Sequence, residues 1–290
     1  MICNQCPRQC HIDRESAVGF CRSPAAFRVA RAALHLWEEP CISGKNGSGT
    51  VFFSGCNLRC VFCQNEEISH RNKGVEVTDD KLIAIFESLI AQGAENINLV
   101  NPTHYAGRLA DVLSHWHSPV PVVYNSSGYE SAETLRRLEG LVDVYLPDFK
   151  YIRSEKALRY SRAEDYPQTA MAALAEMRRQ QPADVFDERG MMQKGMIIRH
   201  LILPANTNSS LEILDYLQEH FPDTYLSLMA QYTPCGDLSE TPEINRPITA
   251  REYNKVADAA VERGMEKVFL QKRSSSDKKF IPAFDFTGIM

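Results

Sequence analysis

From residue 50 onward, short apolar runs alternate along the chain with stretches in which apolar residues recur every three or four positions. A run of four to eight apolar residues predicts a buried strand, and the wider spacing predicts a helix with one buried face. The predicted strands span residues 50–55, 96–101, 119–125, 141–149, 194–204, 224–232 and 267–270. The predicted helices span 78–93, 104–117, 131–140, two segments within 154–180, 209–220 and 249–264.

The order of these elements predicts the class of fold. Strands that alternate with helices and are apolar throughout indicate a parallel sheet covered on both faces. No glycine-rich phosphate loop follows the first strand, which argues against an open, doubly wound sheet. We therefore predict an α/β fold, a partial (β/α)6-type TIM barrel, in which residues 184–195 form an inserted hairpin.

Three helix starts carry capping signals. Thr78 stands before the first predicted helix as an N-cap residue. Ser209 with Glu212, and Thr249 with Glu252, have the spacing of a capping box. We expect the two later helices to begin at these pairs.

Residues 1–45 show no such alternation and contain four closely spaced cysteines. We predict a cysteine-rich metal- or cluster-binding extension at 1–45 and a barrel domain at 46–290. Compositions of 44% hydrophobic and 24% charged residues are those of an ordinary globular protein. Since no apolar run is long enough for a membrane span and no signal peptide is recognisable, we expect no membrane association and a cytoplasmic location. The net charge of −5 argues against nucleic acid as a partner, although a local basic patch stays compatible with it.

Nine cysteines are unusual for a chain of 290 residues. Seven of them fall into two groups, which we call the N-terminal cysteines (Cys3, Cys6, Cys10, Cys21) and the cysteine triplet (Cys56, Cys60, Cys63). Clustered cysteines without a secretory signal indicate metal ligands rather than disulfides. Cys41 and Cys235 stand alone, and we expect each to be a small buried apolar side chain.

The cysteine triplet lies in "GCNLRCVFCQN", directly after the first predicted barrel strand. In a βα barrel the active site lies at the carboxyl ends of the strands. Three thiolates can hold three irons of a [4Fe-4S] cube and leave the fourth iron open to a small molecule. The alternative is zinc with a fourth ligand such as His70, although zinc motifs usually come as two C-x2-C pairs.

The C-x3-C-x2-C spacing after a first barrel strand resembles the radical S-adenosylmethionine (radical SAM) superfamily. This resemblance implies that the open iron binds SAM, and that reductive cleavage of SAM yields a 5′-deoxyadenosyl radical that abstracts hydrogen from a substrate. Further segments, among them "NLVNPTHY", "VVYNSSGYE", "YLPDFKY" and "IIRHLILP", resemble the PflX-like group related to pyruvate formate-lyase activating enzymes.

The resemblance also implies which residues contact SAM. Phe62 matches an aromatic residue near the adenine, and "DFK" matches a motif that places Asp148 and Lys150 beside SAM. "NPT" stands where the superfamily has a Gly-Gly-Glu segment, without its glycines and carboxylate. The remaining candidates from these segments are Asn101, Thr103, His104, Asn125, Ser127 and His200.

Several of these residues have a simpler interpretation that stays open. Asp148 and Lys150 also fit a surface ion pair, and His104 and His200 also fit core histidines with satisfied hydrogen bonds. His35 with Glu38 and Glu39 fits a structural tether to the barrel at least as well as a catalytic role. Three methionines fit packing of the core or the hairpin: Met191, Met192 and Met196.

The N-terminal cysteines, spaced C-x2-C-x3-C-x10-C, can supply four thiolates, which closes a metal site. A second [4Fe-4S] cluster and a zinc ion both remain open. The function predicted is that of a radical SAM enzyme with an electron donor of the flavodoxin or ferredoxin type, acting on a protein glycine or on a peptide or small metabolite. The alternative from another class, a non-catalytic iron–sulfur carrier or sensor, needs neither an open iron nor a large barrel.

Overall fold

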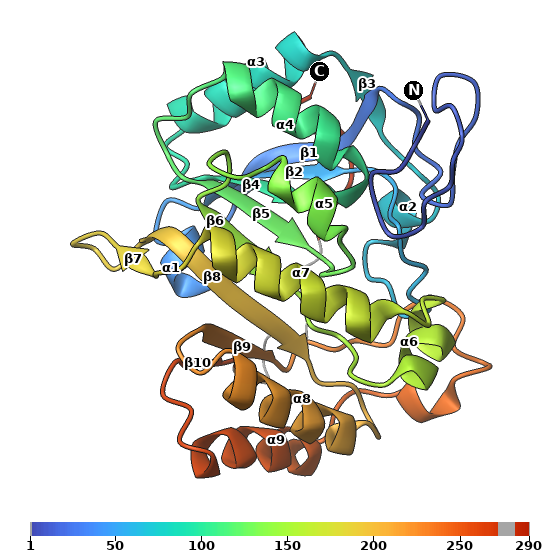
Figure 1. Cartoon of the computed structure of the whole chain (residues 1–290), viewed down its shortest axis with the longest axis vertical. Coiled ribbons are helices and arrows are strands. Elements are labelled where there is room, and N and C mark those ends of the chain that lie inside the picture. The colour runs from blue at the N-terminus through green and yellow to red at the C-terminus, as the bar shows by residue number, and fades with distance from the viewer. Residues whose placement is uncertain (1, 272–281, 290) are drawn as a thin grey trace.

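The computed structural model describes residues 2–271 and 282–289, which build one continuous sheet with helices packed on it (Figure 1). Seven parallel strands run side by side in the order β2, β4, β5, β6, β8, β9, β10. Their bounds are Ser48–Phe53, Ile97–Val100, Val122–Ser126, Val144–Pro147, Met192–Leu201, Tyr225–Met229 and Val268–Leu270. The predicted partial barrel of parallel strands is therefore confirmed.

Helices connect the strands and cover the sheet. Figure 1 shows α4, α5 and α7 lying across the face of the sheet that is turned to the viewer, with α8 and α9 over β9 and β10. The helices are α1 (Pro40–Ser43), α2 (Glu66–Ser69), α3 (Asp79–Ala91), α4 (Ala106–His115), α5 (Ala132–Arg136), α6 (Ser154–Ser161), α7 (Tyr166–Gln180), α8 (Thr207–His220) and α9 (Ala250–Glu262). Two 3-10 turns, η1 (Thr103–Tyr105) and η2 (Pro242–Ile244), lie in the connections.

Most local signals in the sequence act as expected. The side chain of Thr78 accepts the amide of Lys81 at the start of α3, and Thr249 with Glu252 forms a complete capping box on α9. The predicted capping box of α8 is wrong, because α8 begins two residues earlier and the carboxylate of Glu212 binds Arg153 instead. The hairpin is confirmed, since β7 (Val185–Phe186) pairs antiparallel with β8. Met191, Met192 and Met196 are buried, as packing requires.

Residues 1–45, in which the sequence analysis identified no strand, contain β1 (Phe27–His35). β1 pairs antiparallel with β2, and β3 (Val75–Val77) pairs antiparallel with β1. The register of β1 shifts between Val29 and Arg31, so a bulge interrupts the alternation of buried and exposed side chains that would have revealed the strand. The part of the chain that precedes the sheet, residues 2–26, holds all four N-terminal cysteines, and the predicted boundary at 45 divides the β1–β2 hairpin.

Residues 282–289 return to β1 and lie along its outer edge beside β3. The amide of Ala32 donates to the carbonyl of Thr287 (2.9 Å), and the amide of Phe286 donates to the carbonyl of Ala30 (3.1 Å). Phe284 packs edge-on against Phe52 of β2. The part of the chain that the structure describes contains no helix of the length and apolarity that a bilayer span requires.

Candidate active site

The cysteine triplet lies in the loop after β2, at the carboxyl ends of the parallel strands. Two of its sulfurs accept hydrogen bonds from side chains of distant segments. The amide of Asn101 donates to Sγ of Cys56 (3.2 Å), and the hydroxyl of Ser161 donates to Sγ of Cys60 (3.0 Å). Such donors stabilise the thiolate, which is the form of cysteine that binds metal.

Burial makes these thiols hard to ionise without a metal. It raises the pKa of Cys56 to about 12 and that of Cys63 to about 11, and the neighbouring Cys60 adds to both shifts. Burial also raises the pKa of Cys60, while Lys150 opposes that shift. At neutral pH, thiols of this kind lose their protons only when a metal cation binds to the sulfur instead. The donor set fits an iron–sulfur cluster, whose irons offset the charge of the thiolates.

Among residues 2–271 and 282–289, no three His, Cys, Asp or Glu side chains converge closely enough to hold one metal ion. A single ion and a cluster differ in this respect. One zinc ion gathers its ligands around one centre, whereas each thiolate of a cube binds a separate iron, so that the sulfurs lie further apart. A cluster therefore does not require the three sulfurs of the triplet to converge on one point.

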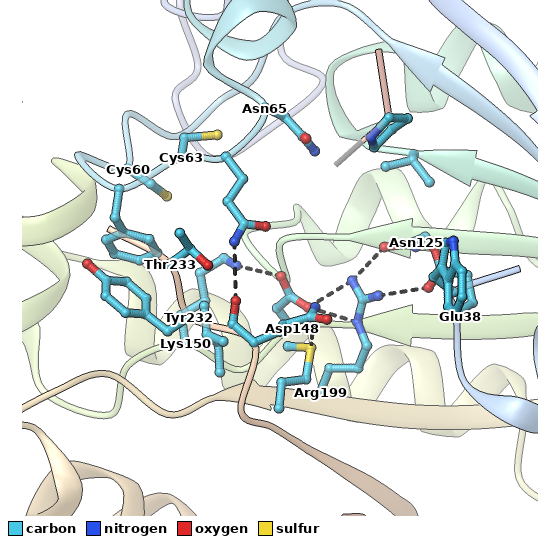
Figure 2. Close-up of a pocket in the computed structure, with 18 of the residues that line it drawn as sticks. Glu38, Cys60, Cys63, Asn65, Asn125, Asp148, Lys150, Arg199, Tyr232 and Thr233 are labelled. Carbon is cyan, nitrogen blue, oxygen red and sulfur yellow. Dashed lines mark hydrogen bonds and ion pairs between the residues drawn. The ribbon is translucent and has the colours of Figure 1, made fainter. Parts of the chain in front are cut away.

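A cavity of about 270 Å³, which we call the strand-end cavity, opens beside the triplet (Figure 2). Cys60 and Cys63 lie on one side of it, and polar residues from several strands lie on the other. Its lining includes His35, Trp37, Glu38, Phe62, Asn125, Asp148, Lys150, Arg199 and Tyr232. The rings of Phe62 and Tyr232 meet edge-to-face at 5.6 Å between centroids, which gives the cavity an apolar, aromatic wall.

A chain of buried charges crosses the strand-end cavity (Figure 2). Lys150 Nζ donates to one carboxylate oxygen of Asp148 (2.5 Å), and Arg199 donates to the other (2.9 Å). Arg199 also donates to Oδ1 of Asn125 (2.6 Å) and lies 3.2 Å from the carboxylate of Glu38. We call this set the charge network. Because its Asp148–Lys150 pair is largely buried, the interpretation of that pair as a surface ion pair is wrong.

Electrostatics keep the centre of the charge network ionised. Burial opposes ionisation of Asp148, but Arg199 and Lys150 together hold the pKa of its carboxyl below the usual value. Burial likewise disfavours the charged form of Lys150, yet Asp148 outweighs it and raises the pKa of Lys150. Burial raises the pKa of Glu38 against the attraction of Arg199. The network therefore offers both cations and a carboxylate to a ligand that carries both charges, such as an amino-acid head group.

Four of the nine residues predicted to contact SAM line the strand-end cavity: Phe62, Asn125, Asp148 and Lys150. Two others form a second line of contacts to the triplet. Oγ1 of Thr103 lies 2.8 Å from Oδ1 of Asn101 and 2.5 Å from the carboxyl of Glu130, so that a polar chain leads from Glu130 to Cys56. Burial raises the pKa of Glu130 to about 7, although hydrogen bonds from Thr103 and its neighbours oppose the shift.

The last three predicted contacts lie away from the strand-end cavity. Nε2 of His104 is 2.8 Å from the carbonyl of Ser54, and burial lowers the pKa of His104 to about 3. His200 bonds the Phe149 carbonyl through Nδ1 and the Ser210 hydroxyl through Nε2, as a core histidine does. Ser127 is buried with its hydroxyl directed to no partner among the described residues.

The sequence analysis missed the central cation of the charge network. Arg199 follows three apolar residues, Met196–Ile198, near the carboxyl end of strand β8, and its charge at that position was the available signal. Successive side chains of a strand point to opposite faces, so His200 faces the helices while Arg199 faces the strand-end cavity. For Glu38 the sequence analysis left open a structural tether and a catalytic role. Its carboxylate accepts a hydrogen bond from Arg199, although 161 positions separate the two residues.

The N-terminal cysteines lie in turns rather than in helices or strands. Cys6 and Cys21 are buried, and burial together with Cys21 and Cys3 raises the pKa of Cys6 to about 12. Three non-glycine residues with positive φ adjoin cysteines of this group: Gln9 (φ 40°), His11 (φ 51°) and Arg22 (φ 59°). Left-handed backbone at such residues persists only where the surroundings enforce it. No disulfide joins any of the nine cysteines within the described residues. Cys41 is buried as expected, and Cys235 is only partly buried.

Side chains of this segment hold it against the barrel close to the triplet. Arg14 donates to the carbonyl of His104 (2.5 Å), and Arg8 donates to the carbonyl of Asn57 (2.9 Å). A Cβ placed at Gly55 would lie 2.7 Å from the carbonyl oxygen of Cys21, so only glycine allows this approach. The two groups of cysteines are therefore near neighbours.

Fold and site together define an α/β partial barrel with three metal-binding thiols and a charged cavity at its strand ends. The profile of the Radical SAM superfamily matches residues 50–193. An uncharacterized protein of Methanocaldococcus jannaschii is 30% identical over 279 residues, which cover 92% of this chain and 76% of that protein. The chain belongs to the radical SAM superfamily, as its triplet predicted.

Two solved structures share the fold at low identity. One is SuiB of Streptococcus suis bound to S-adenosylmethionine, with a TM-score of 0.52, 13% identity and coverage of 75% of this chain and 48% of that one. The other is HydG, a maturase of the [FeFe]-hydrogenase, with a TM-score of 0.50, 14% identity and coverage of 80% and 53%. This chain thus spans about half the length of either structure. Superfamily membership makes it an enzyme with SAM and a [4Fe-4S] cluster as cofactors.

Proposed function

We propose that this chain is an activating-enzyme-like radical SAM enzyme that removes a hydrogen atom from a glycine of a protein substrate. The cofactors, when bound, supply one-electron cleavage of SAM to a carbon radical. The single observation that carries the proposal is that the charge network and two cysteines of the triplet, Cys60 and Cys63, line one cavity. A peptide or small metabolite is the second substrate class that the sequence leaves open.

The residues of this chain would bind and orient SAM beside the triplet. Lys150 and Arg199 would bind its carboxylate, Asp148 its ammonium group, and the Phe62–Tyr232 wall would pack against its adenine. All five side chains are largely buried, so they would also exclude water from the reacting carbon. The cysteines of the triplet would hold the cluster, as the donor set allows.

The mouth of the strand-end cavity supports a polypeptide substrate. Leu36 and Trp37, which follow β1, expose 52% and 59% of their surface, and Trp37 also lines the cavity. Large apolar side chains exposed next to a polar cavity are typical of surfaces that bind polypeptides. A small metabolite would be enclosed by the cavity and would gain nothing from side chains outside it.

The proposal includes two further parts. Reduction of the cluster requires an electron donor, which we take to be a carrier protein of the flavodoxin or ferredoxin type. The N-terminal cysteines would hold a second metal centre, either a [4Fe-4S] cluster or zinc. The support is that Cys3 and Cys21 lie near enough to Cys6 to add to its raised pKa.

The experiment separates SAM cleavage from substrate choice. Anaerobically reconstituted protein with SAM and dithionite should release 5′-deoxyadenosine, and with pyruvate formate-lyase as the probe substrate it should produce a glycyl radical signal in electron paramagnetic resonance. Trp37→Ala should reduce the glycyl signal while leaving 5′-deoxyadenosine release without substrate unchanged. Release without any glycyl radical would refute the glycine substrate, and absence of release would favour an iron–sulfur carrier.

A further inference from the structure

A second cavity, of about 280 Å³, lies on the other side of the triplet, and we call it the basic cavity. Cys60 and Cys63 line it as they line the strand-end cavity, so these two cysteines separate two openings. The residues that give the basic cavity its character are Arg22, Arg59, His70 and Arg162. They come from the N-terminal segment, the triplet loop, the end of α2 and the end of α6, and Figure 1 shows the N-terminal segment next to α2.

The arginines of the basic cavity are not neutralised by the described parts of the chain. None of the three forms an ion pair within residues 2–271 and 282–289, and of the two acids at the cavity one, Glu66, is paired with Arg71. The other, Asp237, accepts a hydrogen bond from the amide of Ser239. A chain with a net charge of −5 thus gathers three arginines, against two carboxylates, around two cluster thiols.

Backbone contacts fix the inner part of this surface. Arg59 donates to the carbonyl of Ser69 (3.2 Å), whose hydroxyl lies 3.2 Å from Sγ of Cys63. Arg22 donates to the carbonyl of His70 (3.0 Å). Burial lowers the pKa of His70, and the three arginines lower it further against the opposing effect of Glu66, in agreement with a net positive potential at His70.

The position of the outer arginines indicates a role beyond offsetting the charge of the cluster. Arg59 is half-buried and near Cys56, where it stabilises thiolate charge. Arg22 and Arg162 are exposed, so most of the electric field of their guanidinium groups extends into the solvent. Exposed cations around an opening steer an oppositely charged partner toward it and fix its orientation.

We propose that the basic cavity is the docking surface for an acidic, flavin-bearing electron carrier of the flavodoxin type. This inference rests on the proposed function, which requires one electron for each cleavage of SAM. The step balances as one electron lost by the reduced flavin and one electron gained by the cluster. A flavin is favoured because Cys60 and Cys63 line a cavity, which the projecting edge of a ring can enter.

The arrangement gives the triplet two sides with different tasks. SAM and substrate approach through the strand-end cavity, and the electron arrives through the basic cavity. Since Cys60 and Cys63 line both cavities, the electron crosses only the cluster itself between donor and SAM. The donor can then remain bound while the substrate occupies the opposite opening.

The test measures binding directly. Oxidised flavodoxin is titrated into the reconstituted protein by calorimetry at low and at high ionic strength. Arg162→Glu and Arg22→Gln should each raise Kd about three- to tenfold and reduce its dependence on salt. Arg251→Glu, a matched charge reversal on the exposed face of α9, should leave Kd as in the parent. Circular dichroism and iron content confirm that each variant is folded and loaded.

Turnover then separates the two proposals. The cavity variants should lower flavodoxin-supported release of 5′-deoxyadenosine by the same factor as binding, while dithionite-supported release stays at the parent level. Unchanged flavodoxin affinity in both variants would overturn the docking surface, as would an effect confined to a ferredoxin titrated in parallel. If dithionite-supported release is absent in the parent, the proposed function fails, whereas the calorimetry still decides the docking surface.

Discussion

The two groups of cysteines are neighbours, yet they are positioned in different ways. The triplet follows a buried parallel strand, and side chains from the loop after β4 and from α6 donate to its sulfurs. The N-terminal cysteines lie in turns whose backbone is left-handed at three non-glycine residues, and arginine side chains tie the segment to the barrel. The sheet therefore fixes the first site before any metal binds, whereas the second is held by side-chain contacts to the barrel, and residues 2–26 contain no strand or helix of their own around its cysteines.

This difference teaches how the two sites depend on metal. A site built on strand ends keeps its geometry when the metal leaves, because the strands are held by the core. A small turn-rich segment without a core of its own takes its folding free energy from metal binding. We expect the barrel to tolerate loss of its cluster and the N-terminal segment to unfold locally on loss of its metal.

The largest effect should come from removing either set of ligands. The triple variant with Cys56, Cys60 and Cys63 replaced by alanine should lose about four irons and all SAM cleavage, with residues 2–26 as resistant to protease as before. Replacing the four N-terminal cysteines by serine should leave those four irons and expose residues 2–26 to protease. Iron and zinc analysis together with limited proteolysis measures both variants. Equal protease resistance of residues 2–26 in the two variants would contradict the proposed difference between the two sites.

The next effect tests whether the barrel site is preformed. Arg199→Ala leaves Asp148 and Glu38 buried without their shared cation, which should lower the free energy of unfolding by about 3–5 kcal/mol. The control is Arg153→Ala, which breaks the exposed ion pair with Glu212 and should cost at most about 1 kcal/mol. Denaturant titration of the metal-free protein measures both. Similar losses in the two variants would mean that the charge network is not needed to hold the fold.

Glu130 lies between the two groups, since it adjoins the polar chain to Cys56 and adds to the raised pKa of Cys6. The pKa of its carboxyl is about 7 in the folded state and 4.5 in the unfolded reference state. Between pH 4.5 and about pH 7 the folded state therefore binds more protons than the unfolded state. The free energy of unfolding should fall by about 3 kcal/mol as the pH rises through this window. Denaturant titrations across this pH range should show that Glu130→Gln makes the free energy of unfolding less dependent on pH. An equally steep dependence in the variant would mean that another group causes it.

The smallest effect concerns SAM alone. Lys150→Ala removes one charge-assisted contact and should weaken SAM binding by about 1.5–3 kcal/mol, roughly ten- to a hundredfold. The visible absorbance of the cluster should be unchanged, because Lys150 is not an iron ligand. Lys150→Arg need not restore affinity, since a planar guanidinium replaces a compact ammonium group. Equilibrium dialysis of SAM measures the affinity, and parent-like binding by Lys150→Ala would remove this residue from the SAM contacts.

The sequence predicted the parallel strands well, because strands buried on both faces are apolar without interruption. It missed β1, where a bulge shifts the register between Val29 and Arg31. For the cavity, the sequence supplied Asn125, Asp148 and Lys150, since the carboxyl ends of neighbouring strands meet at one edge.

The rest of the site depends on contacts that no local pattern contains. The neighbours Arg199 and His200 point to opposite faces of β8, and only the packing of the sheet shows which face holds the cavity. Glu38 reaches Arg199 across 161 positions, which no spacing rule predicts. The basic cavity is likewise assembled from segments far apart in the chain, so its arginines look in sequence like ordinary surface residues.

The return of residues 282–289 to β1 has a consequence for the order of synthesis. Residues 30–32 of β1 bond to residues 286–287, and Arg31 pairs with Asp285, 254 positions later. A nascent chain therefore emerges from the ribosome with this stretch of β1 unprotected, and an open strand edge is a template for pairing with other chains. The edge closes only after residue 287 has emerged, so we expect this stretch of β1 to be open to pairing with other chains until then.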